Sequence, residues 1–512
     1  MAEGRWGLWL GPAAALLVAQ PAPVVYRVAV PDPARAEVRI EMAVPARAGS
    51  HVDLRMATWS PGFYKVEPYA GEIQALEARD GKGAVLPVAH PAANRWEVTL
   101  GAAEGLTVTY RLRCTGSTVT TNTVTPAFAV LNGPATWLAW HGEGARPCEV
   151  AVALPETWRT AATGLDPAAG ASHRFTAPDY DTLADAPLLL GNPTLRTFTV
   201  GGVTHTVAEE GAPADWKGDR AVEDLGAILQ EALPYWGGTL PYRRYVFLNV
   251  FRPGGGGLEH GSSTLVTTNP ARVVTPEGYL GWLRFMAHEY VHAFNVKRLR
   301  PVELGPFDYE RPPVTPSLWV SEGLTSYLAD LAVARAGRGG PEGFLASLSA
   351  QIGRLQAAPG RLKQGLAQSS REVWTNSLSG VGASPDTVSY YIKGQVVGFL
   401  LEAELRRRGG SLEHALTEAY RRFGGARGFT PEEFRAVLEA EAMGPLKAWL
   451  DAAVERPGEL DYAPALAWFG LRFARGEAGP TWRLEPDPAA APEAKAHWEA
   501  FMRPRGRGLV AP

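Results

Sequence analysis

The chain has 512 residues, of which 46% are hydrophobic and 20% are charged. This composition excludes an intrinsically disordered protein and allows several domains, each with a sizeable core. The formal net charge of −3 gives no electrostatic reason to expect nucleic acid as a partner. The two cysteines, Cys114 and Cys148, lack metal-ligand spacing and are too few for a disulfide framework. The sequence leaves open whether they pair with each other.

Residues 1–22 have several features of a signal peptide. An apolar run from Trp6 to Ala19 is too short to span a bilayer and has the length of a signal-peptide core. Pro12 interrupts the run, and no clean A-x-A cleavage site precedes Gln20, which speaks against a signal peptide. The length of the apolar run nevertheless favours export. We predict a periplasmic or secreted protein, with a cytoplasmic one as the alternative. No later stretch is long and apolar enough for a membrane helix, so stable membrane insertion is not expected.

Residues 23–195 have the pattern of an antiparallel β-sandwich or saddle-shaped sheet. Apolar and polar residues alternate in Val25–Val30, Ala36–Met42 and Leu106–Leu112, and Pro, Gly and Asp separate such segments. An aromatic turn, Trp59–Tyr64, interrupts this region. We expect it to pack against a neighbouring domain, and contact with a ligand is the alternative.

Residues 196–457 form a second region, in which strands are followed by helices. The strands are predicted first and the helical lobe last, which favours an α+β domain. The predicted elements are a hairpin (Thr197–Ala208), a helix (Ala221–Trp236), a strand (Arg244–Phe251), a strand (Ser262–Val266), a helix (Glu277–Val296) and a helix from Leu318. Residues 341–455 are mostly helical by pattern. Residues 458–512 are predicted as a short tail.

The predicted helix Glu277–Val296 contains the pattern H-E-x-x-H. His288 and His292 are four residues apart and therefore lie on one face of the helix, where both can bind one metal ion. Zinc prefers imidazole nitrogens, and a catalytic zinc site keeps one position open for water. Glu289 lies beside this face and can act as general base on that water. The basic run after the helix, residues 297–300, is interpreted as cations that complement the helix C-terminus.

A catalytic zinc site needs a third protein ligand. Glu322 is the best candidate because it is one of few charges in an apolar helix, where a carboxylate is costly to bury unless it is paired or metal-bound. The competing carboxylates are Glu303, Asp308 and Glu310 in the intervening loop. A stabilising role of Glu322 near the helix start is the alternative to metal binding.

Two further segments carry candidate site residues. Four glycines at Gly254–Gly257 precede Glu259 and let a substrate backbone approach closely, so Gly257 is a candidate substrate contact. The Glu259 carboxylate could hold a free ammonium group, and a turn residue is the alternative. Tyr391, at the start of an apolar helix, could donate a hydrogen bond to an oxyanion. Burial of Tyr390 and Tyr391 in the core is the alternative there.

These motifs occur in an order that resembles the glycyl aminopeptidase family, a group of gluzincin zinc metallopeptidases related to aminopeptidase N. The resemblance rests on Gly256–His260, His288–His292 with Asn295–Arg298, Trp319–Gly323 and Tyr391–Gly394. It implies a thermolysin-like catalytic domain and one Zn²⁺ per chain bound by three ligands. The implied ligands are His288, His292 and Glu322.

The same resemblance implies the remaining roles. Glu289 would be the base, Glu259 would bind the substrate amine, and Tyr391, with Tyr390 as the fallback, would stabilise the transition state. The family usually ends in a PDZ domain, which is expected here to be lost or reduced to a remnant within residues 458–512. The predicted activity is release of small amino-terminal residues (Gly or Ala) from peptides. The alternatives are an endopeptidase, another hydrolase, and a binding protein with a vestigial site.

Overall fold

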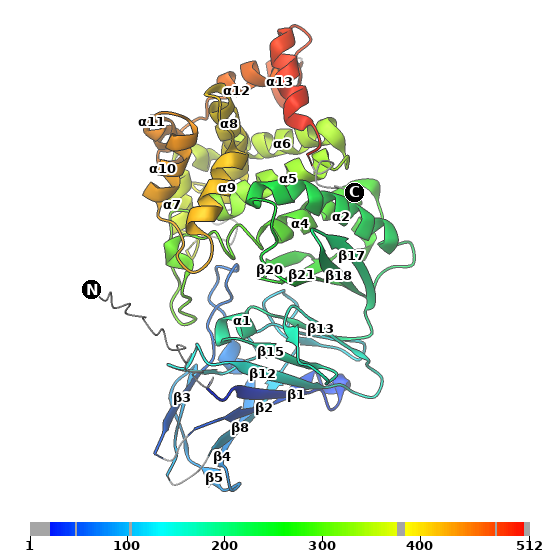
Figure 1. Cartoon of the computed structure of the whole chain (residues 1–512), viewed down its shortest axis with the longest axis vertical. Coiled ribbons are helices and arrows are strands. Elements are labelled where there is room, and N and C mark those ends of the chain that lie inside the picture. Colours follow the sequence, from blue (N-terminus) through cyan, green and yellow to red (C-terminus); the bar gives the residue numbers. More distant parts are fainter. Residues whose placement is uncertain (1–20, 47–48, 102–104, 376–384, 477–478, 506–512) are drawn as a thin grey trace, which may run out of the picture.

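The computed structural model describes residues 21–46, 49–101, 105–375, 385–476 and 479–505. The prediction of an α+β fold is confirmed, because a β-rich half precedes a half dominated by helices (Figure 1). The signal-peptide prediction for residues 1–22 falls almost entirely outside the described residues. Within the described residues, no helix has both the length and the apolar content to cross a membrane.

The first half is built from sheets that share one core. Its elements are β1 (Val24–Ala29), β2 (Glu37–Val44), β3 (His51–Arg55), β4 (Ile73–Asp80), β5 (Val85–Leu86), β6 (Val88–Ala92), β7 (Arg95–Thr99), β8 (Leu106–Arg113), β9 (Thr123–Val124), β10 (Ala129–Leu131), β11 (Ala139–Trp140), β12 (Cys148–Ala153), β13 (Thr160–Thr163), β14 (Asp166–Pro167), β15 (Arg174–Ala177), α1 (Tyr180–Ala184) and β16 (Leu188–Gly191). We call this half the β domain.

The largest sheet of the β domain has the order β14-β15-β12-β1-β2-β8-β4-β5. Its neighbours are antiparallel except β1 and β12, which run parallel. Two four-stranded sheets, β13-β16-β10-β9 and β11-β3-β7-β6, pack on it through one apolar cluster. Alternation explains this packing, since Val38, Ile40 and Met42 of β2 are fully buried. Both cysteines are buried and free, so they do not pair.

The second half starts with a five-stranded sheet. Its strands are β17 (Thr194–Val200), β18 (Val203–Glu210), β19 (Arg244–Phe251), β20 (Gly256–Glu259) and β21 (Ser263–Thr268). The order is β17-β18-β19-β21-β20, which leaves the glycine-rich β20 at the edge of the sheet. The strand predicted at Arg244–Phe251 coincides with β19, and its residues are almost all buried.

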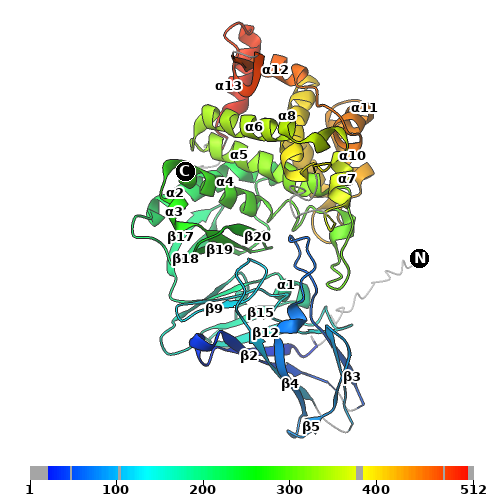
Figure 2. The same ribbon diagram turned by 180° about the vertical axis from the view of Figure 1, so that it is seen from behind.

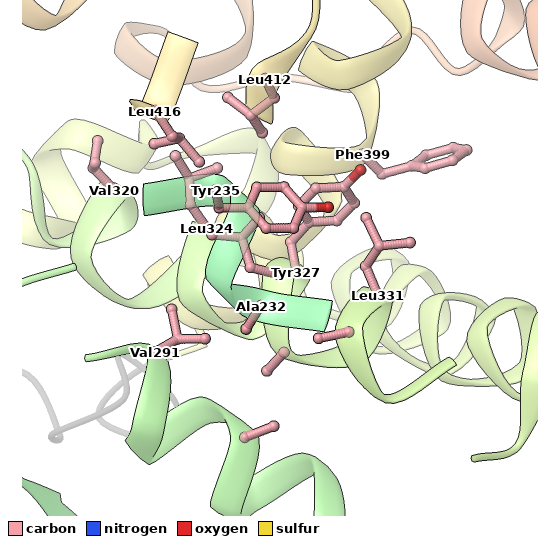
Figure 3. Packing of buried hydrophobic residues seen from close by; sticks show 14 of the residues in the cluster. Ala232, Tyr235, Val291, Val320, Leu324, Tyr327, Leu331, Phe399, Leu412 and Leu416 are labelled. Carbon is pink, nitrogen blue, oxygen red and sulfur yellow. The ribbon is translucent and has the colours of Figure 1, made fainter. Parts of the chain in front are cut away.

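Helices cover one face of this sheet and form the upper lobe (Figures 1 and 2). They are α2 (Gly218–Ala232), α3 (Pro270–Val273), α4 (Pro276–Val291), α5 (Leu324–Arg335), α6 (Gly340–Ala357), α7 (Leu366–Arg371), α8 (Tyr390–Arg407), α9 (Leu412–Phe423), α10 (Pro431–Glu441) and α11 (Lys447–Leu450). Figure 3 shows their shared core, in which Val291 of α4, Tyr327 of α5 and Phe399 of α8 lie in one cluster. We call this half the catalytic half, because it contains the motifs whose order resembles the glycyl aminopeptidase family.

The helix that carries the two histidines is shorter than predicted. Thr275 caps its start by accepting a hydrogen bond from the Gly278 amide, and Pro276 occupies its first turn. It ends at Val291 and not at Val296, because the chain turns after His292 and forms a bridge between Asn295 and Leu299. Val296 has a φ of 119°, which a continuing helix excludes.

The final described segment packs on the catalytic half. It contains α12 (Ala463–Phe469), β22 (Leu471–Gly476), β23 (Gly479–Pro486) and α13 (Pro492–Met502). Phe469 and Phe501 are fully buried in the same core as α5 and α8. The buried Arg335 of α5 donates hydrogen bonds to the Phe501 carbonyl at 2.6 and 2.9 Å. This part of the predicted tail is therefore an integral layer of the fold.

Candidate metal centre and peptide site

The α4 helix and the residue that caps its end, His292, present both histidines to one point, as their spacing predicts. The two Nε2 atoms of His288 and His292 lie 3.0 Å apart. Their rings are perpendicular, with centroids 4.5 Å apart. His292 is almost fully buried, whereas the side chain of His288 is 13% exposed. Two imidazole nitrogens this close, both facing the same space, suit a shared cation.

Glu322 completes the group from a neighbouring element. It lies on a single π-helical turn, η5 (Trp319–Gly323), which leads directly into α5. Its Oε2 atom is 3.3 Å from His288 Nε2 and 3.1 Å from His292 Nε2. Tetrahedral zinc with bonds of about 2.0–2.1 Å separates its ligand atoms by about 3.3 Å. The three side chains therefore fit a zinc ion, and they are the one such group among the described residues.

Hydrogen bonds hold the two imidazoles in the orientation that a metal requires. His292 Nδ1 donates to the Asn295 carbonyl at 2.9 Å, so its Nε2 is free to coordinate. His288 Nδ1 is 3.2 Å from Ser326 Oγ. The Asn295 amide in turn donates to the Val320 carbonyl at 2.7 Å and to Thr325 Oγ1 at 2.9 Å. Asn295 thus joins the end of the histidine helix to the segment that carries Glu322.

The charges at the site also favour a bound cation. Glu259, Glu289 and Glu322 are each at most 4% exposed. Burial acts to lower the pKa of His292, but Glu322 and the other two carboxylates outweigh it and raise this pKa to about 10. Burial raises the pKa of Glu289 well above its usual value. A buried excess of carboxylates of this kind is stable when a metal or an ammonium group balances it.

The candidate base Glu289 lies beneath the edge strand. A Cβ atom on Gly257 would come within 2.2 Å of Glu289 Oε1, so only glycine lets β20 lie this close to the carboxylate. Glu289 Oε2 is buried and has no hydrogen-bond partner among the described residues. This arrangement explains the position of Gly257, and it leaves one carboxylate oxygen available for a water or substrate group.

Tyr390 and Tyr391 lie at the start of α8, where Ser389 caps the helix. The Tyr391 ring is half-buried and lies beside the His288 ring, with centroids 6.0 Å apart. Tyr390 is fully buried, and its hydroxyl is hydrogen-bonded to that of Tyr391. Burial and the nearby Glu322 raise the pKa of both phenols well above the usual value, so both stay protonated. The structure therefore places Tyr391 at the open side and Tyr390 behind it.

Two glycines fix α8 against the Glu322 turn. A Cβ on Gly323 would come within 2.5 Å of the Gly394 Cα, and one on Gly394 within 2.8 Å of the Gly323 Cα. The glycines of the two short motifs, W-x-x-E-G and Y-I-K-G, thus touch each other. Their contact sets the spacing between Glu322 and Tyr391.

Glu259 ends β20 and lies close to the metal-binding group. Burial raises its pKa, while the field of His292 acts to lower it. The next residue, His260, points away from the site, and its Nδ1 lies 3.1 Å from Asp185 Oδ1 of the β domain. Asp185 also accepts hydrogen bonds from Lys297 Nζ at 2.8 Å and from the Gly261 amide at 2.7 Å. One carboxylate of the β domain thus clamps the segments that follow Glu259 and His292.

The structure also shows the contacts of the basic residues 297–300 and of the three carboxylates that compete with Glu322 as metal ligands. The Lys297 side chain is only 7% exposed and is ion-paired with Asp185, so the interpretation of residues 297–300 as cations at a helix end is wrong for this residue. The neighbouring Arg298 does donate to the Ala293 carbonyl near that end. Glu310 pairs with Arg55 of the β domain, and neither it nor Asp308 nor Glu303 belongs to the metal-binding group.

Comparison with known families agrees with this geometry. Residues 25–192 match the family described as the peptidase M61 N-terminal domain, and residues 281–397 match the M61 glycyl aminopeptidase family. The chain belongs to the M61 peptidase family. The matched regions contain the β domain and all three residues of the metal-binding group. No curated relative matches the sequence of this M61 peptidase.

Solved structures are similar over most of the chain. An aminopeptidase N family protein from Idiomarina loihiensis is 25% identical with a TM-score of 0.84, and the match covers 88% of this chain and 79% of that one. A mutant M1 zinc metallopeptidase from Deinococcus radiodurans, bound to a Tyr-Ser-Ala substrate, is 16% identical with a TM-score of 0.53, over 86% and 95% of the two chains. The second likeness shows the fold alone. The M61 protein is a metallopeptidase of the aminopeptidase type.

Proposed function

We propose that this M61 peptidase uses one zinc ion to release small amino-terminal residues, glycine or alanine, from peptides. The observation that carries the proposal is the position of Glu259. Its buried carboxylate lies next to the group formed by His288, His292 and Glu322, where a free ammonium would balance its charge. In the proposed binding mode, an amine held there places the first peptide bond at the metal-binding group. The family description supports the preference for a small first residue.

The residues of the site supply a complete hydrolytic set. A zinc ion held by His288, His292 and Glu322 would polarise the scissile carbonyl and lower the pKa of the attacking water. Glu289 takes a proton from that water and delivers it to the leaving amine. Burial raises the pKa of Glu289, which favours its holding the proton between the two transfers. Tyr391 donates a hydrogen bond to the oxyanion that develops on the carbonyl.

The leaving part of a peptide has a groove beside the edge strand. A cavity of about 610 Å³ is lined by Gly254–Gly256 at the start of β20, by α3 and by residues of α4 between Glu277 and Phe285. Since β20 is an edge strand, a peptide could add to it as a further strand and extend along this cavity. This supports oligopeptides as substrates.

A panel of aminoacyl reporters, with and without a chelator, tests the proposal. We expect glycyl and alanyl substrates to be hydrolysed, chelation to abolish hydrolysis, and added zinc to restore it. Peptides with a free amine should be cleaved and their acetylated forms should not. Equal cleavage of both forms would favour the endopeptidase alternative and would contradict the role of Glu259.

A further inference from the structure

The β domain sends one aromatic turn into the catalytic half. After β3, residues 59–64 form a loop that rises from the β domain toward the catalytic half, drawn in blue in Figures 1 and 2. Trp59 at its base is fully buried and donates from its indole to the Asp308 carbonyl at 2.9 Å. Its ring also packs edge-on against Trp374, with centroids 5.4 Å apart. The turn is thus anchored in the catalytic half, as the sequence led us to expect.

The far side of the turn belongs to the core of the catalytic half. Tyr64 is buried in the same apolar cluster as α4 and α5 and lies edge-on to Trp374 at 5.8 Å. Phe63 packs on a cluster that contains Leu258, the residue before Glu259. These contacts on both sides of Gly62 leave the turn little freedom to move away from the site.

Gly62 itself lies against the carboxylate of Glu259. A Cβ on Gly62 would come within 2.3 Å of Glu259 Oε1 and 2.5 Å of Oε2. The same carboxylate is close enough to His292 and Glu322 for their charges to act on its pKa. Glu259 is therefore covered by backbone on one side and faces the metal-binding group on the other. An ammonium can reach it from the side of the histidines, and a chain that continues beyond the amine meets Gly62.

We propose that the Ser60–Tyr64 turn of the β domain closes the substrate cleft at the amine end and so restricts the enzyme to peptides with a free amino terminus. Gly62 is the specificity-determining residue of this closure. This inference rests on the proposed aminopeptidase function. It adds that the requirement for a free amino terminus arises in part from the β domain. Gly62 must be glycine because a side chain there would collide with the Glu259 carboxylate and displace it from the position in which it meets the ammonium.

The variant Gly62→Ala tests the closure, with Gly83→Ala as its matched control. Gly62 has a φ of +93° and Gly83 a φ of +87°, so alanine is strained similarly at both positions. Nothing lies within 4 Å of a Cβ on Gly83. With alanyl-p-nitroanilide we expect Gly62→Ala to raise KM about tenfold or more, with a smaller change in kcat, because ammonium binding is lost. Gly83→Ala should keep the KM of the wild-type protein.

The variant Phe63→Ala provides a second test, and it introduces no side chain at a residue with a positive φ. Loss of its packing should loosen the turn and lower the ratio of cleavage of alanyl-p-nitroanilide to its N-acetyl form by about tenfold. The inference alone is overturned if the wild-type protein discriminates between these substrates but Gly62→Ala has the same KM as Gly83→Ala. If Gly62→Ala does not fold, the inference is overturned when Phe63→Ala keeps the wild-type cleavage ratio. A wild-type protein that cleaves both substrates equally would overturn the proposed function and this inference together.

Discussion

The two halves of the molecule contribute to the site in different ways. The catalytic half supplies every residue of the metal-binding group and the candidate base, from α4, its C-cap and the η5 turn. The β domain supplies Gly62 and Asp185, which contact the segments around Glu259 from outside. One half therefore carries the chemistry, and the other shapes and fixes the place where a substrate end would bind. Each half can be perturbed separately.

The largest effect is expected from loss of a metal ligand in the catalytic half. Glu322→Ala removes the oxygen that lies 3.1 and 3.3 Å from the two histidine nitrogens. We expect zinc content and hydrolysis to fall below detection, because two protein ligands hold zinc poorly. Glu303→Ala is the control, since this exposed carboxylate in the preceding loop lies outside the group. Full zinc content in Glu322→Ala, measured by elemental analysis, would contradict the ligand assignment.

The next largest effect concerns the two tyrosines of α8. We expect Tyr391→Phe to lower kcat by about 10²–10³-fold with little change in KM, as for loss of one oxyanion donor. Tyr390→Phe should have a smaller effect, since Tyr390 is fully buried behind Tyr391. Steady-state kinetics of both variants decide between them. A larger loss in Tyr390→Phe would reverse the assignment.

Substitution of Asn295 tests whether its contacts hold the metal-binding residues of the catalytic half in place. Its amide joins the segment after α4 to the η5 turn and α5, and its carbonyl orients His292. Asn295→Ala removes the amide contacts and should weaken zinc affinity by about 10–100-fold, the usual cost of losing such a supporting contact. Competition with a chromogenic chelator measures this affinity. An unchanged affinity would show that the helix ends keep their positions without the amide.

Substitution of Asp185 tests how much the β domain contributes to the stability of the fold and how this contribution depends on pH. Burial acts to raise the pKa of Asp185, but Lys297 and His260 outweigh it and hold the pKa well below its usual value. A carboxyl with a lowered folded-state pKa stabilises the fold above its unfolded pKa, about 3.9, and loses this contribution as pH falls below that value. Asp185→Asn should therefore cost about 3 kcal/mol at neutral pH, since it leaves the Lys297 ammonium, on a side chain only 7% exposed, without its partner.

The control for this variant is Asp166→Asn, an exposed position in the same domain. Thermal unfolding should separate the two variants at pH 7, and the difference between Asp185→Asn and the wild-type protein should shrink as pH falls below 4. A midpoint for Asp185→Asn that equals the wild-type one at pH 7 would contradict the clamp.

The same division explains what could be predicted from sequence. His288, Glu289 and His292 lie on one helix, so their spacing alone places them together. Glu322 could be found because a lone carboxylate in an apolar helix needs a partner. The contacts of Gly62 with Glu259 and of Asp185 with Lys297 join positions far apart in the chain and follow no local pattern. The helix end at Val291 was missed because the turn after it depends on the contacts of Asn295 with η5.

The turnover of Glu289→Gln at measured zinc content tests most directly whether zinc and Glu289 together hydrolyse peptides. The substitution keeps the shape of the side chain and leaves all three metal ligands in place, but glutamine cannot accept the proton of the attacking water. We predict that zinc content stays at one ion per chain while kcat for alanyl-p-nitroanilide falls by about 10²–10⁴-fold. Wild-type turnover by the zinc-loaded Glu289→Gln variant would contradict the account.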